Sequence, residues 1–227
     1  MLARLFQIYT PRSVLDVGCG RGAWLLVAER LGSEVLRGID GPWVPSHGLL
    51  SPNIEFTAVD MDHDFDITGR FDLCISLEVA EHLHESRAGW LVQKLCGASD
   101  VVLFSAAIKD QGGTNHVNEQ WQRYWIDLFQ ERGFECFDAI RGWAWRNEAI
   151  DWWYRQNAFV FVSRTHASFG TVEQELSKLS ETIVDAVHPG NYEKKMKAVE
   201  SYERAIKEPD LAFCLSVLRN YLRAKFI

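Results

Sequence analysis

The sequence lacks any long apolar run and any cluster of basic residues. No stretch reaches 18 consecutive apolar residues, so no segment is predicted to span a membrane. The 227 residues include 24 Lys/Arg against 31 Asp/Glu, a formal net charge of −7 at pH 7. Because nucleic-acid binders usually present a basic surface to phosphate groups, this balance disfavours DNA or long RNA as a partner.

Cysteines are few and scattered. The five of them, Cys19, Cys74, Cys96, Cys136 and Cys214, show no paired spacing of the kind that marks a disulfide framework or a zinc site. The first residues also lack the long apolar stretch of a secretory signal, so we expect a cytoplasmic protein with free thiols. With 47% hydrophobic and 12% aromatic residues, the chain can bury the core of one α/β domain.

The most informative segment is a glycine-rich turn near the N-terminus. An apolar run over residues 14–17 contains Asp16 and is followed by Gly18, Gly20 and Gly22. Apolar residues then recur at helical spacing, which predicts a strand, a tight turn and a helix. Glycines let the backbone approach a ligand closely, and a helix N-terminus offers unpaired N–H groups. A dinucleotide fingerprint needs two residues between its second and third glycines, and this turn has one. An ordinary tight turn is the alternative.

With Asp16 inside the strand, the turn resembles the first motif of the class I S-adenosylmethionine (SAM)-dependent methyltransferases. Further apolar runs follow in the order that this resemblance requires: residues 34–39 before Asp40, residues 55–59 before Asp60, and residues 71–77 ending at Leu77. A carboxylate after the second run can accept both ribose hydroxyls of an adenosine cofactor. The resemblance implies a SAM-binding set of Asp16, Gly18, Gly20, Gly22, Asp40, Asp60 and the Leu77 backbone. The neighbouring Asp62 and Asp64 are expected to be solvated loop charges.

The complete pattern predicts an α/β, Rossmann-like fold with the seven-stranded sheet of class I methyltransferases and a C-terminal helical extension. The expected strands cover residues 14–17, 34–39, 55–59, 71–77, 100–105, 135–139 and 157–163, and the last two form an antiparallel hairpin. Helices are expected over residues 86–96 and 119–132. Because the sheet is then complete near Arg164, we expect a methyltransferase domain over residues 1–166 and an extension over residues 167–227.

The extension is predicted to form three helices, over residues 171–187, 192–206 and 211–226, broken at Pro189 and Pro209. Their apolar stripes include Leu176, Leu179, Ile183, Leu211, Leu215, Leu218 and Leu222. Such stripes have to be buried, either by folding back on the domain or by pairing with a second copy or a partner enzyme. We expect the extension to serve oligomerisation or acceptor binding rather than SAM binding.

A candidate catalytic cluster follows the fourth expected strand, in the segment Glu78-Val-Ala-Glu81-His82. If this segment is helical, its two carboxylates and its imidazole lie on one face and can hold Mg²⁺ or Mn²⁺. The segment resembles the Glu-x-x-Glu-His motif of small-RNA 2′-O-methyltransferases and of O-methyltransferases in ubiquinone biosynthesis. In those enzymes a metal engages a vicinal diol or a catechol. The resemblance to the small-RNA enzymes adds His116 as a further ligand.

The same motif also occurs in class I methyltransferases without a metal, where the first Glu lies beside the SAM amino group. In that interpretation His82 or His116 is a plain general base or a packed polar residue. A sugar hydroxyl is far from ionised at neutral pH, so its methylation needs a base or a cation. We predict His82, His116 and Glu78 as catalytic residues, and Glu78, Glu81, His82 and His116 as metal ligands.

Residues 104–121 and 151–157 more closely resemble a bacterial group of uncharacterised methyltransferases that is often associated with surface-polysaccharide loci. These segments combine side-chain amides with flat indole faces, which suits carbohydrate recognition, although each tryptophan could equally belong to the core. Asn115, Trp121 and Trp153 are therefore predicted to bind the acceptor. The predicted reaction is O-methylation of a sugar hydroxyl of a glycan or saccharide precursor. The alternatives are 2′-O-methylation of an RNA end, methylation of a small aromatic diol, and a SAM-binding scaffold without turnover.

Overall fold

The computed structural model describes residues 1–166, 169–178 and 185–225. Its centre is a seven-stranded sheet with the order β3-β2-β1-β4-β5-β7-β6. The strands are β1 (Ser13–Val17), β2 (Val35–Asp40), β3 (Ile54–Ala58), β4 (Leu73–Leu77), β5 (Val101–Ser105), β6 (Phe134–Phe137) and β7 (Phe159–Ser163). The α/β, Rossmann-like methyltransferase fold predicted from the sequence is confirmed.

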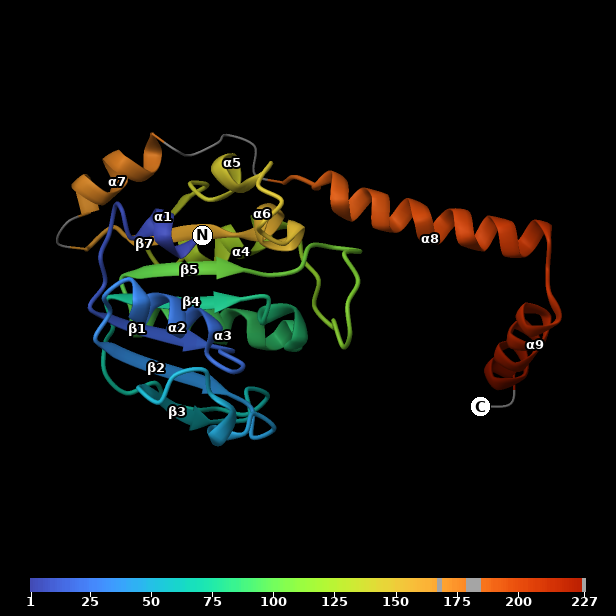
Figure 1. The fold of residues 1–227 in the computed structure, drawn as a ribbon, viewed down its shortest axis with the longest axis horizontal. Coiled ribbons are helices and arrows are strands. Elements are labelled where there is room, and N and C mark those ends of the chain that lie inside the picture. Colours follow the sequence, from blue (N-terminus) through green and yellow to red (C-terminus); the bar gives the residue numbers. More distant parts are fainter. Residues whose placement is uncertain (167–168, 179–184, 226–227) are drawn as a thin grey trace. The chain divides into compact units, whose positions relative to one another are not determined.

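Five strands are parallel, so their carboxyl ends meet at one edge of the sheet, on the right in Figure 1. β7 is antiparallel both to β5 and to β6, which confirms the predicted final hairpin. The register places Asp16 of β1 beside Gly38 of β2 and Ile75 of β4. Residues that follow β1, β2, β3, β4 and β5 are thereby brought to a common edge, where ligands of open α/β sheets bind.

Helices cover both faces of the sheet. Side chains of α1 (Leu2–Leu5), α2 (Ala23–Arg30), α5 (Arg141–Ala144) and α7 (Phe169–Ser177) share one core cluster, and those of α3 (Glu85–Ala98) and α4 (Gln122–Gln130) share the other. Along β5 the side chains alternate accordingly: Val101 and Leu103 join the first cluster, and Val102 and Phe104 join the second. Because β5 is buried on both faces, its sequence is a nearly continuous apolar run.

Two predicted helices differ from the structure around the site. The helix expected over residues 119–132 begins only at Gln122, and Glu119 lies in the loop before it. The segment from Glu78 to His82 is not an α-helix, because only Ala80–His82 form a single 3₁₀ turn. Glu78 precedes this turn with φ 57°, a left-handed conformation that ends β4 and cannot be part of a right-handed helix.

The predicted domain boundary after residue 166 also differs from the compact units of the structure, which are Met1–Ala186 and Val187–Ile227. The reason is α7, whose Val172 and Leu176 are buried in the first core cluster. Leu176 is therefore part of the sheet-containing unit. Leu179 and Ile183, which were predicted to continue its stripe, lie outside the described residues.

The second unit consists of α8 (Pro189–Lys207) and α9 (Leu211–Lys225). Pro189 was expected to separate two helices, and α8 indeed begins at this residue, where a missing N–H costs nothing. The His188 ring nitrogen caps this turn by accepting the Gly190 N–H at 3.0 Å. Of the helices in the described part of the chain, none is long and apolar enough to cross a membrane.

Candidate functional site

A cavity of about 560 Å³ opens at the carboxyl edge of the sheet. It is lined by residues that follow four parallel strands and by one residue from the loop after β5. These residues are Gly18, Asp40, Trp43, Asp60, Met61, Asp62, Glu78, Val79, His82, Leu83 and Asn115. The lining includes four carboxylates and, among its described residues, no Lys or Arg. A cationic or neutral ligand suits this cavity better than a phosphate-rich one.

The glycine turn between β1 and α2 is shaped by close packing. Gly18 has φ +84°, and a Cβ at this position would lie 2.2 Å from Cγ2 of Val79. Gly22, the N-cap of α2, has φ +79°, and its Cβ would lie 2.5 Å from Cδ1 of Ile54. Both positions therefore require glycine for conformation and for space.

Asp40, the last residue of β2, is fixed by the backbone around it. Its Oδ2 accepts the N–H of Gly20 at 2.6 Å, and its Oδ1 accepts the N–H of Gly41 at 2.6 Å. Each carboxylate oxygen keeps a free lone pair after these bonds. The carboxylate is thus held at the cavity wall, and both of its oxygens can still accept hydrogen bonds from hydroxyl groups of a ligand.

Asp16 lies beneath the turn and is only 1% exposed. Its Oδ2 has no hydrogen-bond partner within the described structure. Burial, and secondarily the negative charge of Asp40, raises the pKa of the Asp16 carboxyl to about 8. Without a ligand, Asp16 is therefore a mostly protonated group in the core.

The rim of the cavity near β3 is formed by Trp43, Asp60 and Asp62. The Trp43 indole packs over Gly41, where a Cβ would lie 2.1 Å from the ring, and it is 73% exposed. The Asp60 carboxylate accepts the N–H of Asp62 at 3.0 Å, which fixes this turn. Asp62 was expected to be a solvated loop charge; it is exposed, and it also borders the cavity.

Glu78 is positioned by an amide cluster. Its carboxylate accepts Nδ2 of Asn157 at 3.2 Å and Nε2 of Gln111 at 3.2 Å. Gln111 is in turn held by Asn157 Nδ2 and Gln156 Nε2, both 3.0 Å from its Oε1. Burial raises the pKa of the Glu78 carboxyl, and hydrogen bonds from Ser105, Asn157 and Gln111 oppose that shift. The left-handed backbone and this cluster turn Glu78 toward the cavity.

Glu81, His82 and His116 form a separate group. One potential ligand atom from each residue lies within 4.8 Å of the others, as far as the described residues show. Glu81 is fully buried, and neither of its carboxylate oxygens has a partner that meets hydrogen-bond geometry. Burial, followed by the charge of Glu78, raises the pKa of the Glu81 carboxyl to about 9, and the backbone N–H groups of Glu81 and Ala107 partly oppose the shift.

The two imidazoles of the group pack edge to face, with ring centroids 4.9 Å apart. Nδ1 of His116 lies 2.8 Å from Oε1 of Glu119, which also accepts the N–H of Gly112 at 2.6 Å. Because a carboxylate only accepts, Nδ1 of His116 is the donor to Glu119, and in the neutral ring Nε2 then carries the lone pair. Burial, and then the neighbouring His116, lowers the pKa of His82.

A comparison with families of known proteins decides the family. A model described as a methyltransferase domain matches residues 1–174, more than three quarters of the chain. The chain belongs to this methyltransferase family. A search of curated proteins finds no match.

The fold of the methyltransferase domain is similar to several solved structures. One is a protein from Nostoc punctiforme PCC 73102, with a TM-score of 0.52 and 13% identity over 71% of this chain and 54% of that chain. A second is DhpI in complex with SAH, with a TM-score of 0.51 and 15% identity over 72% of this chain and 82% of that chain. A third is the methyltransferase domain of bacterial CtHen1-C, with a TM-score of 0.51 and 16% identity over 71% of this chain and 94% of that chain. At these identities the likeness concerns the fold. The chain spans about half the length of the Nostoc protein and of human N-acetylserotonin methyltransferase.

Several predicted site residues of the methyltransferase domain lie together. Gly18, Asp40, Asp60, Glu78, His82 and Asn115 line one cavity. The four-ligand group predicted from the Glu-x-x-Glu-His motif is not formed as such, because Glu78 lies with the amide cluster and the remaining three residues gather without it. The reason is again the left-handed backbone of Glu78, which separates it from the 3₁₀ turn that carries Glu81 and His82.

The two tryptophans predicted to bind the acceptor are not among the residues that line the described cavities. Trp121 precedes α4 and is 43% exposed, so it does not share the buried face of Trp125 and Phe129. Trp153 lies in α6 (Trp152–Asn157) and packs edge to face on Trp152. Trp43 and Val79 line the cavity without having been predicted, since both depend on loop conformation. The spacing of His116 and Glu119, three residues apart, was an available signal for their contact.

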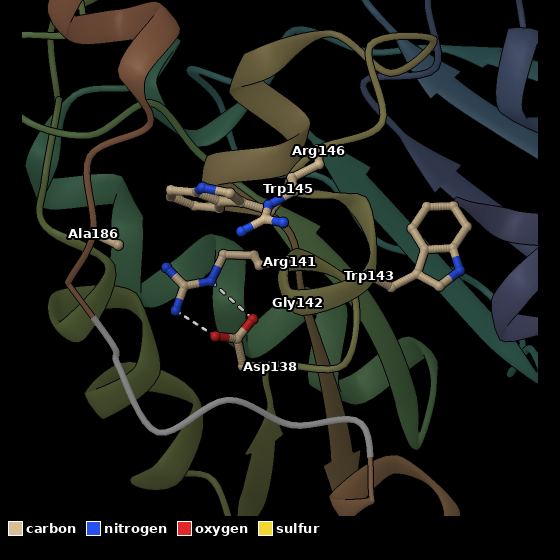
Figure 2. Close-up of a pocket in the computed structure, with 7 residues that line it drawn as sticks. All are labelled: Asp138, Arg141, Gly142, Trp143, Trp145, Arg146 and Ala186. Atoms are coloured by element: carbon tan, nitrogen blue, oxygen red, sulfur yellow. Dashed lines mark hydrogen bonds and ion pairs between the residues drawn. The ribbon is translucent and has the colours of Figure 1, made fainter.

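A second cavity, of about 470 Å³, lies beside α5 (Figure 2). Arg141 pairs with Asp138 there through two hydrogen bonds, one of them 2.8 Å from Nε to Oδ1, and both residues are buried. Trp145 and Arg146 lie near this pair, whereas Trp143 points away from them. Nη1 of Arg141 also donates to the Gln156 carbonyl at 3.4 Å. The second cavity therefore adjoins the amide cluster that positions Glu78.

Proposed function

We propose that this chain is a SAM-dependent O-methyltransferase for a hydroxyl of a neutral saccharide, aided by a divalent cation held by Glu81, His82 and His116. The observation that carries the proposal is the gathering of these three side chains at the cavity that starts from the glycine turn. His82 belongs both to the group and to the cavity lining.

The cavity suits SAM in shape and in charge. A ligand backbone or sugar can approach Gly18 closely, and Asp40 can accept the two ribose hydroxyls. SAM has a sulfonium and an ammonium group against one carboxylate, so its net charge is positive. The carboxylates of Asp60, Asp62 and Glu78 complement that charge. We assign Glu78 to the ammonium group, because the amide cluster holds its carboxylate at the cavity wall.

The residues around Glu81 fit a cation. Neither oxygen of its buried carboxyl has a partner that meets hydrogen-bond geometry, and a cation would compensate the cost of ionising this group. Glu119 fixes the tautomer of His116, as outer partners of metal-binding histidines commonly do. Gly113 makes room for this ring, since a Cβ there would lie 2.2 Å from Nε2 of His116. One carboxylate and two imidazoles favour Mn²⁺ or a similar transition metal over Mg²⁺.

Methyl transfer to a hydroxyl requires alignment and removal of a proton. When bound, SAM would supply a methyl carbon activated by its sulfonium, and the cation would lower the pKa of a bound hydroxyl. The chain supplies the rest. Asp40 and Glu78 orient the two ends of the cofactor, and Asn115 borders the cavity as a neutral hydrogen-bonding group. The proton of the acidified hydroxyl would leave to solvent, because the one lone pair of a neutral His82 ring would be bound to the cation.

The acceptor is proposed to be neutral because of the cavity lining. The vicinal hydroxyls of a sugar can bind a cation, and so can those of the ribose at an RNA end. Methylation of an RNA end is the second candidate for that reason. The four lining carboxylates and the lack of Lys or Arg among the described lining residues disfavour the phosphates of RNA.

The test is turnover of SAM by the full chain with a panel of acceptors. The panel contains neutral saccharides, nucleotide sugars, a catechol and a short RNA, and release of S-adenosylhomocysteine is measured with Mn²⁺, with Mg²⁺ and with a chelator. We expect turnover with a neutral saccharide and with Mn²⁺. Turnover only with RNA or with catechol would show that the acceptor is not a saccharide. SAM binding without any turnover would support the scaffold alternative.

A further inference from the structure

Helix α9 presents an unusually apolar surface. Six large apolar side chains on it are between 45% and 76% exposed, and none of its described residues is buried. They are Leu211, Leu215, Val217, Leu218, Tyr221 and Leu222. The four leucines follow one another at spacings of four, three and four residues, and so form one stripe. Val217 and Tyr221 lie beside the stripe and widen the apolar face to roughly half of the helix circumference.

The charges of α9 are all of one sign. The helix contains Arg219, Arg223 and Lys225 and no acidic residue. Residues 187–227 together contain eight Lys/Arg and five Asp/Glu, a net charge of +3, whereas residues 1–186 contain 16 and 26, a net charge of −10. The chain as a whole is therefore acidic, although its C-terminal unit carries a net positive charge.

From this combination we infer that α9 binds the surface of an anionic membrane, with its apolar face in the lipid and its basic residues at the headgroups. Such a helix lies in the interface and does not span it, which agrees with its length of 15 residues. A second copy of α9 fits less well, because it would bring two positively charged helices together and would cover only part of so broad an apolar face. An anionic membrane can bury the apolar face of α9 and also attract its basic residues.

The experiment is co-sedimentation of the full chain with vesicles. One set contains phosphatidylcholine alone, and the other contains phosphatidylcholine mixed with phosphatidylglycerol. We expect binding to the mixed vesicles that weakens as salt is added, and much weaker binding to phosphatidylcholine alone. Leu218→Glu is expected to lower partitioning about fifty-fold, by loss of an apolar contact and by its new charge. Asn220→Glu, the matched control, adds the same charge on the polar face and is expected to cost about fivefold.

A double neutralisation, Arg219→Gln with Arg223→Gln, separates charge from apolar contact. We expect partitioning to mixed vesicles to fall about twentyfold and partitioning to neutral vesicles to stay the same. Circular dichroism of each variant checks that the fold is retained. The inference is overturned if binding is equal on both vesicle types or absent from both. It is also overturned if the lipid-free chain is a dimer by light scattering that Leu218→Glu converts to a monomer.

Discussion

The two halves of the main cavity are built by different means. The half under β1 and β2 is made by backbone: glycines packed against Val79 and Ile54, and N–H groups that hold Asp40. The half beyond β4 and β5 is made by side chains on irregular segments, among them Glu78, His82 and Asn115. Glu81 and His116 lie beside His82. The first half depends on the absence of Cβ atoms, and the second depends on charge and on loop conformation. Substitutions should therefore act on the two halves in different ways.

The largest effect is expected from Glu81→Gln in the side-chain half. We predict a loss of turnover of about 100-fold or more, together with loss of Mn²⁺ dependence, because the carboxylate ligand is removed. SAM affinity should change little. His47→Gln is the control, since this exposed histidine lies outside the group. Full activity of Glu81→Gln in the presence of a chelator would return His82 to the role of a plain general base.

Gly18→Ala tests the backbone half. A Cβ would lie 2.2 Å from Val79 at a residue with φ +84°, so we predict a loss of about 2–4 kcal/mol in the free energy of unfolding. Gly20→Ala is the matched control: its φ is +52°, but no atom lies within 4 Å of its Cβ position, and we predict a loss of about 1 kcal/mol. Denaturant unfolding measures both. Equal losses would mean that close approach to Val79 is unimportant.

A pH-dependent effect is expected from Asp16. Its pKa is about 8 in the folded chain against 3.8 when unperturbed, so between about pH 4 and pH 8 only the unfolded state is ionised. The free energy of unfolding should therefore fall as pH rises through this range, by at most about 1.4 kcal/mol per unit from this group. Below pH 4 and above pH 8 the contribution is constant.

Asp16→Asn should reduce that slope, leaving the part that the raised pKa of Glu81 contributes, and should stabilise the chain at neutral pH. Unfolding at a series of pH values checks the prediction. Asp62→Asn, an exposed rim residue, should leave the slope in place. An unchanged slope in Asp16→Asn would assign the whole effect to other buried carboxyls such as Glu81.

The backbone half could be predicted from the sequence because regular spacing determines it. A parallel strand followed by a glycine turn places Gly18 at the carboxyl edge, and the acidic end of the next strand must then lie beside it. Asp40 accordingly accepts the N–H of Gly20, a contact between residues 20 positions apart. The seven-stranded sheet and its final hairpin were implied by the resemblance to class I methyltransferases, which the order of the apolar runs supports.

For the side-chain half, the sequence predicted which residues take part but not how they are arranged. The residue types Glu81, His82 and His116 were identified, but the role of Glu78 as a fourth ligand rested on a helix that its left-handed backbone prevents. No residue pattern marks a glutamate with positive φ. The spacing of His116 and Glu119 signalled their contact, but the helix expected from residue 119 left out the loop in which both residues lie. The approach of His116 to Glu81 and His82 depends on how segments far apart in sequence meet, which spacing within one segment does not determine.

The central claim is that this cavity binds SAM through the fixed carboxylate of Asp40, and calorimetric titration tests it most directly. SAM is titrated into the unaltered chain, into Asp40→Ala, and into Asp66→Ala as a control whose carboxylate pairs with Lys94 outside the cavity. We predict one site in the unaltered chain, unchanged affinity in Asp66→Ala, and a loss of about 1–3 kcal/mol in Asp40→Ala from unpaired ribose hydroxyls. Equal affinity in all three proteins, or no binding by the unaltered chain, would contradict the claim.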